Sequence, residues 1–416
     1  MTDLQNELLE RFLRYVKTYS QSDEKSADAG NIPSTVQEWD LAKMLEAEMK
    51  EIGLEGVHIT EHCYVYGYLK ASEGLEDVAP LALLAHIDTV EEVSGKDVKP
   101  QIIREYDGSV ITLSEGSKID PAADEALRLA GEERDTIITS DGTTLLGADD
   151  KAGVAAIMTA ISAIKKQNIP HGKIEVIFSP DEETGHGMDK VPIAEIESRK
   201  AYTVDGGHIG ELETECFNAY KSEITFTGKS LHTGSARPRM VNAVTMASSF
   251  VANLPRQEAP ETTDGYMGFY APMEITGSVE SAYVYLLLRD FTAEGMERRK
   301  AFVDSLANVT ARSFGGKVEV KHTEQYLNMK SKLDEHPEVV ENLVAAYKAA
   351  GVEPIFQPIR GGTDGSRLTQ MGIPTPNIFT GGHNYHSRTE WLSFSQCTKA
   401  MQVLIELARI STKDKK

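Results

Sequence analysis

Apolar segments of strand length alternate with helix patterns over the first half of the chain. The strand-like runs lie at 64–69, 81–85, 173–178 and 201–204, and a helix pattern covers 151–167. Apolar strands separated by helices are typical of a largely parallel sheet that is covered on both faces. The sequence therefore predicts an α/β fold with a doubly wound, mostly parallel sheet.

The middle of the chain follows a different pattern. Residues 222–227, SEITFT, alternate between polar and apolar as a half-exposed antiparallel strand does. They are followed by a helix, a strand, a second helix and a last strand, which we expect at 241–254, 282–289, 292–314 and 317–322. This block predicts an inserted α+β domain of smaller size.

After this block the doubly wound pattern resumes to the end of the chain. The 416 residues exceed the roughly 250–300 at which a single core stops growing, so two domains are expected. We predict a discontinuous catalytic domain, 1–215 with 327–416, and an inserted lid domain, 216–326. The acidic segment 120–135 is interpreted as an exposed helix.

Charge and cysteine content restrict the kind of partner and the compartment. Lys and Arg number 43 against 64 Asp and Glu, a net charge of −21, which argues against nucleic acid or an anionic membrane as partner. The N-terminal segment carries charges between its apolar positions, which does not fit a signal peptide. Cys63, Cys216 and Cys397 are interpreted as free thiols, and a cytoplasmic location is expected.

Five short segments place His, Asp or Glu after predicted strands, where open α/β sheets bind ligands. They are LLAHIDT (His86, Asp88), LLGADDKAG (Asp149, Asp150), FSPDEETG (Asp181, Glu182, Glu183), YTVDGG (Asp205) and GGHNYH (His383, His386). Each alone fits a helix cap, a turn or a surface pair. Together they predict a site for two cations, and imidazole with carboxylate suits zinc.

The same segments, together with PIRGGTDG, resemble those of a dizinc exopeptidase family. That family includes the tripeptide aminopeptidases, carboxypeptidase G and the succinyl-diaminopimelate desuccinylase, and the resemblance is greatest to the tripeptide aminopeptidases. It runs nearly end to end, through PSTVQEW, IPHG, GELE, MVNA, ETTDGYMGFY and LRDF. The resemblance implies two zinc ions per subunit, for which cobalt or manganese can substitute.

Ligand roles follow from this resemblance position by position. It implies that His86 and Asp205 bind one zinc, that Glu183 and His386 bind the other, and that Asp149 bridges the two.

Further roles concern the residues around the metals. The resemblance implies that Glu182 is the general base and that the peptide bond after Asp149 is cis. Asp88 stands two residues after His86, on the same side of an extended segment, so its carboxylate can orient the imidazole.

The inserted domain resembles the family's lid. The resemblance implies that His232 polarises the scissile carbonyl, from the other subunit in dimeric relatives, and that Arg289 holds the substrate carboxylate. Arg360 is expected to line the pocket. For Arg289 the alternative is an ordinary ion pair with Asp290 or another neighbour.

Three positions depart from the family pattern. Thr233 stands where proline is usual, His208 where a small residue is usual, and His383 where tyrosine is usual. None of these changes removes a predicted ligand, but two of them add imidazoles to the segments that carry the predicted ligands.

The expected function is removal of the N-terminal residue from tripeptides, through a water shared by two zinc ions. The expected partners are short peptides, chiefly tripeptides, and a second copy of the chain through the lid. One alternative is a related amidohydrolase: a dipeptidase, a carboxypeptidase or an N-acyl amino acid hydrolase. The other is an inactive metal-binding scaffold, against which Glu182 argues because a scaffold needs no base beside its metals.

Overall fold

The structure is a computed structural model that describes residues 1–414. The chain forms two compact units. The first contains 1–214, 331–357 and the described residues from 363 onward, and the second contains 215–330 and 358–362. Each unit has its own core of buried apolar side chains.

The first unit is built on an eight-stranded sheet with the order β1-β2-β8-β3-β9-β16-β10-β15. The central strands β8, β3, β9 and β16 run parallel, and antiparallel pairs flank them. The strands are β1 (Glu55–Ile59), β2 (Val65–Leu69), β3 (Leu81–His86), β8 (Ile174–Ser179), β9 (Ala201–Gly206), β10 (Glu211–Cys216), β15 (Ile355–Ile359) and β16 (Asn377–Phe379). The predicted α/β class with a parallel sheet centre is confirmed.

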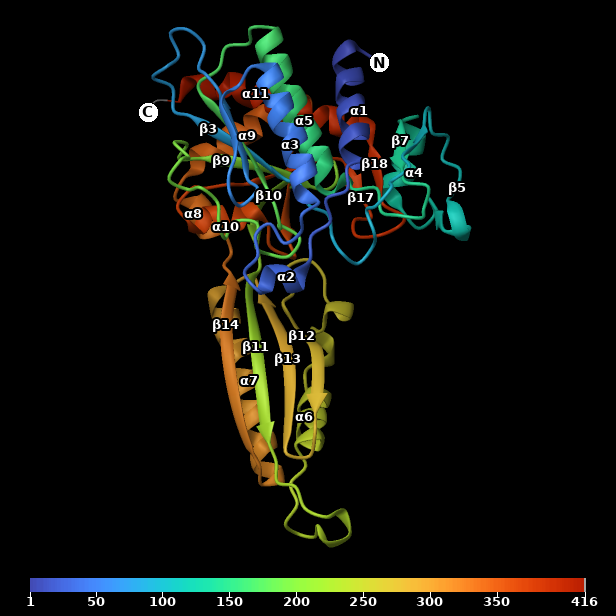
Figure 1. Ribbon diagram of the computed structural model, residues 1–416, viewed down its shortest axis with the longest axis vertical. Coiled ribbons are helices and arrows are strands. Elements are labelled where there is room, and N and C mark those ends of the chain that lie inside the picture. The colour runs from blue at the N-terminus through green and yellow to red at the C-terminus, as the bar shows by residue number, and fades with distance from the viewer. Residues whose placement is uncertain (415–416) are drawn as a thin grey trace. The chain divides into compact units, whose positions relative to one another are not determined.

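Both faces of this sheet are covered, as Figure 1 shows for the first unit. Leu83 and Ala85 of β3 belong to a core cluster that includes residues of α1, α3, α5, α9 and α11, whereas Ala82 and Leu84 belong to a cluster that includes Leu368 of α10. This alternation explains why the strand is apolar throughout. The helices are α1 (Asp3–Val16), α2 (Glu24–Asp28), α3 (Glu38–Ile52), α5 (Ala148–Lys166), α8 (Lys330–Asp334), α9 (Pro337–Ala349), α10 (Asp364–Gln370) and α11 (Phe394–Ile410).

A second, smaller sheet of the first unit has the order β17-β18-β7-β4, and β5 pairs with β6 beside it. Its neighbour α4 (Glu125–Glu132) corrects one prediction. The acidic segment does form a helix, but Leu127 and Ala130 are buried in a cluster with Trp391, so the helix is packed on one side. The strands are β4 (Gln101–Ile103), β5 (Ile111–Thr112), β6 (Lys118–Ile119), β7 (Ile137–Thr139), β17 (Gly382–His383) and β18 (Trp391–Ser393).

The second unit is an antiparallel sheet with α6 and α7 packed on one face (Figure 1). Its strand order is β12-β13-β11-β14. The elements are β11 (Asn218–Thr227), α6 (Ala243–Ala252), β12 (Phe269–Gly277), β13 (Ser281–Asp290), α7 (Ala293–Phe314) and β14 (Lys317–Tyr326). The sequence prediction of three strands missed β12. Pro272 argues against a central strand, and the structure places it at the sheet edge beside a bulge.

Within residues 1–414, none of the helices combines the length and the apolar character needed to cross a lipid bilayer. All three cysteines are buried, and no disulfide joins any of them in the described part of the chain, as their interpretation as thiols predicts.

Candidate metal centre

Four of the five ligand-bearing segments follow the central parallel strands. His86 ends β3, the turn 181–183 follows β8, Asp205 lies in β9, and His386 lies in the loop after β16 and β17. The prediction that Asp149 also follows a strand of this sheet was wrong. Asp149 has non-helical backbone angles and lies in the turn that leads into the regular part of α5, and β7 before it belongs to the small sheet.

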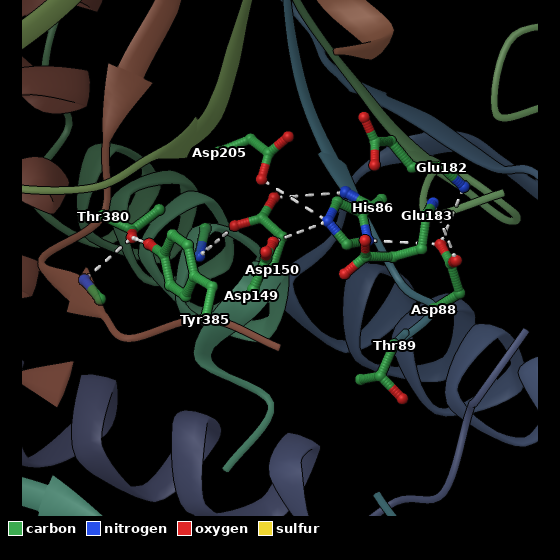
Figure 2. A network of polar contacts seen from close by, with 12 residues as sticks. His86, Asp88, Thr89, Asp149, Asp150, Glu182, Glu183, Asp205, Thr380 and Tyr385 are labelled. Atoms are coloured by element: carbon green, nitrogen blue, oxygen red, sulfur yellow. Dashed lines mark hydrogen bonds and ion pairs between the residues drawn. The ribbon is translucent and has the colours of Figure 1, made fainter. Parts of the chain in front are cut away.

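Asp149 stands between the two predicted ligand histidines. Its Oδ1 lies 3.0 Å from His86 Nε2, which is also 3.5 Å from Asp205 Oδ1 (Figure 2). Its Oδ2 lies 3.3 Å from His386 Nε2, which is also 3.1 Å from Glu183 Oε2. Each oxygen of one carboxylate thus faces a different histidine, which is the arrangement expected of a ligand shared by two cations.

These residues form two candidate metal positions. His86, Asp205 and Asp149 are named the first metal position, and Glu183, His386 and the same Asp149 the second. Side-chain exposure is 14% or less for every member except His386, at 45%. The first position is therefore the more enclosed of the two.

Asp88 is fully buried and joins two parts of this site. Its Oδ1 lies 3.2 Å from His86 Nδ1, and its two oxygens accept the backbone N–H groups of Glu182 and Glu183 at 3.0 and 3.2 Å (Figure 2). One carboxylate therefore holds both the imidazole ring and the turn that carries the two glutamates, as a supporting ligand contact does.

The side chains of Glu182 and Glu183 leave this turn in different directions (Figure 2). Glu183 approaches His386, and its Oε1 is a buried oxygen without a hydrogen-bond partner. A carboxylate oxygen of Glu182 lies within 4.8 Å of ligand atoms of His86 and Asp205, on the side of the first metal position.

The electrostatics of the cluster favour bound cations. Burial raises the pKa of Glu183 and of Asp205 to about 7 in each case, and burial together with Asp205 raises that of Glu182 well above its usual range. The hydrogen bond to Asp149 raises the pKa of His386 to about 11. Carboxylates crowded in this way are charged at neutral pH only if positive charge compensates them. The donor set and the unpartnered Glu183 oxygen therefore fit divalent metal ions.

Asp150 also supports the cluster. Its Oδ1 accepts the N–H of Gly153 at 3.1 Å, and its Oδ2 accepts the backbone N–H of His86 at 3.3 Å. The first contact is that of a helix cap, which was the alternative expected for this segment, and the second contact was not predicted from the sequence. The Asp149–Asp150 peptide bond is cis, as the resemblance implied.

Tyr385 is a second supporting residue that the sequence argument did not single out. Its hydroxyl donates to the carbonyl of Gly206 at 3.0 Å. The same hydroxyl lies 2.8 Å from Thr380 Oγ1 (Figure 2). It thus ties the loop of His386 to the end of β9.

The other three predicted site residues lie in the second unit. His232 is exposed, and its Nδ1 accepts the N–H of Gly234. Arg289 donates to the carbonyls of Tyr220 and Leu288 and to Gln325 Oε1.

Asp290 and Arg360 also have partners within the second unit. Asp290 pairs with Arg299 at 2.9 Å, so the alternative that Arg289 pairs with Asp290 was wrong. Arg360 donates to carbonyl groups of Thr263, Gly265 and Met267 and so holds that loop.

The two additional histidines lie outside both metal positions, as far as the described residues show. His383 stacks on Trp391 with ring centroids 4.0 Å apart, and His208 faces His383 at 5.5 Å. They form a packed aromatic group, which leaves His86 and His386 as the imidazoles of the metal cluster.

Comparison with known proteins identifies the family of this chain. The model of peptidase family M20/M25/M40 matches residues 139–410. A peptidase T of Geobacillus thermodenitrificans is 45% identical over 409 residues, which cover 98% of both chains. A tripeptidase structure from Staphylococcus aureus superposes with a TM-score of 0.78 at 22% identity, covering 99% of each chain. A dinuclear metal-binding peptidase of the M20 family from Bacillus subtilis gives 0.66 at 16% identity, covering 98% of each chain.

The fold and the matched family model define a peptidase of the M20 type. The chain belongs to peptidase family M20/M25/M40 and, within it, to the peptidase T group. The resemblance seen in the sequence motifs is thereby confirmed.

Proposed function

We propose that this chain is a dinuclear metal aminopeptidase that removes the N-terminal residue of tripeptides. The single observation that carries the proposal is the carboxylate of Asp149, whose two oxygens face His86 and His386 at 3.0 and 3.3 Å. The 45% identity to a peptidase T over nearly the whole chain supports the substrate class.

The two metal ions are proposed to be zinc. Two imidazoles with three carboxylates and no thiolate suit zinc, and cobalt or manganese can occupy similar sites. When bound, the ions would supply Lewis acidity, which lowers the pKa of a shared water and polarises the scissile carbonyl.

Glu182 is proposed to move the proton in this reaction. Its carboxylate would take a proton from the attacking water and give it to the leaving amine. Supporting this role, its backbone is held by Asp88 while its side chain diverges from that of Glu183. Asp88 would keep His86 in the tautomer that presents Nε2 to the metal.

Arg289 is proposed to select the length of the substrate. A guanidinium can hold the terminal carboxylate of a peptide through two N–H groups. With the scissile carbonyl fixed at the metals, such an anchor makes the site a ruler that favours three residues. Arg360 is proposed to line the same pocket, and His232 to polarise the carbonyl.

A homodimer through the second unit is part of this proposal. The outer edges of β12 and β14 have no strand partner within residues 1–414. Strand β14 carries exposed Lys317, Glu319 and Lys321, whereas β12 exposes Met273 and Ile275 at 60% and 50%. An exposed apolar edge strand is suited to pairing with another copy, and charged edges resist it. Ile275→Lys should convert the dimer to monomer in analytical ultracentrifugation, whereas Lys321→Ala should not.

The experiment that tests the function is metal removal followed by a substrate comparison. Extensive chelation should abolish hydrolysis of trialanine, and zinc, cobalt or manganese should restore it. The restored enzyme should cleave free-amine tripeptides and not their N-acetylated forms. Full activity in a demonstrably metal-free sample would contradict the proposal, and preference for N-acetylated substrates would favour the N-acyl amino acid hydrolase alternative. Three cysteines without a disulfide support a cytoplasmic site of action.

A further inference from the structure

The turn before the regular part of α5 has buried backbone N–H groups. Gly147 lies in this turn at φ 82°, and Asp149 and Asp150 have non-helical backbone angles. The regular helix therefore begins after them, where Asp150 accepts the N–H of Gly153. Buried backbone N–H groups need an acceptor, and this turn carries Asp149, the residue shared by both metal positions.

Glu390 supplies this acceptor from more than 240 residues away. Glu390 is 1% exposed, and its carboxylate accepts three backbone N–H groups: those of Leu146 at 2.7 Å, Gly147 at 2.8 Å and Asp149 at 3.1 Å. The backbone of the shared ligand is therefore hydrogen-bonded directly to Glu390.

Glu390 also belongs to the segment that carries His386. The two residues are four positions apart, and a compact turn joins them. The N–H of Glu390 donates to the carbonyl of Ser387 at 3.3 Å, and Ser387 Oγ donates to the carbonyl of Asn384 at 2.6 Å. The carboxylate thus ties the backbone of Asp149 to the loop of His386.

We propose that Glu390 is a positioning residue that sets the spacing between Asp149 and His386 and thereby the affinity of the second metal position. This inference rests on the proposed dinuclear function. The first metal position has a different support, because His86 and Asp205 lie on β3 and β9, which pair directly in the sheet. Loss of Glu390 should therefore weaken one metal far more than the other.

The test compares Glu390→Gln with Asp135→Asn as a matched control. Asp135 is a buried carboxylate of the same region whose oxygens accept bonds from Ser393 and Ser395 at the start of α11. Metal-free chains are equilibrated with zinc buffers of graded free concentration, and bound zinc per chain is measured by atomic absorption. Supporting contacts of this kind change metal affinity about 10–100-fold. In Glu390→Gln we expect the affinity for the second zinc to fall by this factor and the affinity for the first zinc to stay unchanged. In Asp135→Asn we expect both affinities to stay unchanged.

A cobalt titration identifies which position is affected. In Glu390→Gln the change in visible absorption from the last cobalt ion should occur at a higher cobalt concentration than in the wild type. At saturating metal, kcat should return to within a few fold of the wild-type value. Glu390→Asp keeps the charge but withdraws the oxygens by one methylene, so it should also weaken the second metal. This variant also serves as the test if Glu390→Gln does not fold.

Three results would overturn the inference: two zincs bound by Glu390→Gln with wild-type affinity, equal weakening of both zincs, or the same weakening in Asp135→Asn. Wild-type binding by Glu390→Asp would also overturn it, in favour of charge alone. A wild-type chain that takes up fewer than two zinc ions is a separate result, which contradicts the dinuclear function itself.

Discussion

The metal cluster of the first unit and the polar residues of the second unit differ in how fully the fold satisfies them. In the first unit, Asp88 is completely buried and both its oxygens are used, whereas the buried Glu183 keeps one oxygen unpartnered. In the second unit, His232 is exposed, and Arg289 bonds to backbone carbonyls and an amide. The carboxylates of the first unit need bound cations to compensate their negative charge, whereas His232 and Arg289 of the second unit already have hydrogen-bond partners.

This difference separates two kinds of functional residue. Groups gathered around buried negative charge must be held by the fold before anything binds, since mutual repulsion would otherwise disperse them. Groups that bond locally can exchange those bonds for a ligand. Conservative substitutions of the residues around the metal positions should therefore have measurable effects even without substrate. Substitutions of the predicted site residues of the second unit should have effects only when substrate is present.

The largest effect is expected from the two adjacent glutamates of the first unit. Glu182→Gln should lower kcat by at least about a hundredfold with two metals retained, because an amide cannot carry the proton. Glu183→Gln should instead lose the metal of the second position. Steady-state kinetics and metal analysis of both variants test which glutamate moves the proton and which binds the metal. Loss of zinc from Glu182→Gln would show that the two roles are reversed.

A smaller but still large loss is expected for His232→Ala. Removing a donor that polarises a carbonyl typically costs about 10²–10³ in kcat. Metal content should stay at the wild-type level, because His232 is exposed in the second unit. Mixing His232→Ala with Glu182→Gln chains should restore activity if the histidine acts across a dimer, and no recovery after confirmed subunit exchange would mean that it acts within its own chain.

For Arg289→Ala the expected change depends on the substrate. Loss of a charge-assisted bond costs roughly 1.5–3 kcal/mol, about tenfold to a hundredfold in kcat/KM for a tripeptide acid. The corresponding amide should be unaffected, and Arg312→Ala, an exposed arginine of the same unit, is the control. An alanine series of two to five residues, free and amidated, provides the measurement. Equal rates for all lengths in the wild type would contradict the ruler.

The smallest effect on the metal site is expected from Leu286→Ala in the core of the second unit. Leu286 is fully buried, and its truncation should destabilise that unit by about 2–5 kcal/mol. Metal content should not change, because each unit has its own core. Denaturant unfolding followed with metal analysis tests this, and concurrent loss of zinc would show that the two units unfold as one.

Much of the fold was accessible from local patterns. Apolar runs and helix periodicity gave the sheet and its helices, since those patterns reflect which faces are buried. Strand β12 was not predicted from the sequence. It contains Pro272, which a central strand would not accommodate, and only the sheet order shows that this residue lies at an edge. The partner of Asp290 likewise could not be read from the chain, since Arg299 reaches it from the next helix.

The sequence by itself determined which chemical groups are available and that five segments offer metal ligands, because residue type and motif are local properties. Only the tertiary structure decided how they meet. It placed Asp149 in the turn that leads into α5, outside the eight-stranded sheet, with its two oxygens facing His86 and His386. It also brought Glu390 to the backbone N–H groups of that turn. Contacts between residues more than 200 positions apart depend on packing of the whole unit, which no local pattern records.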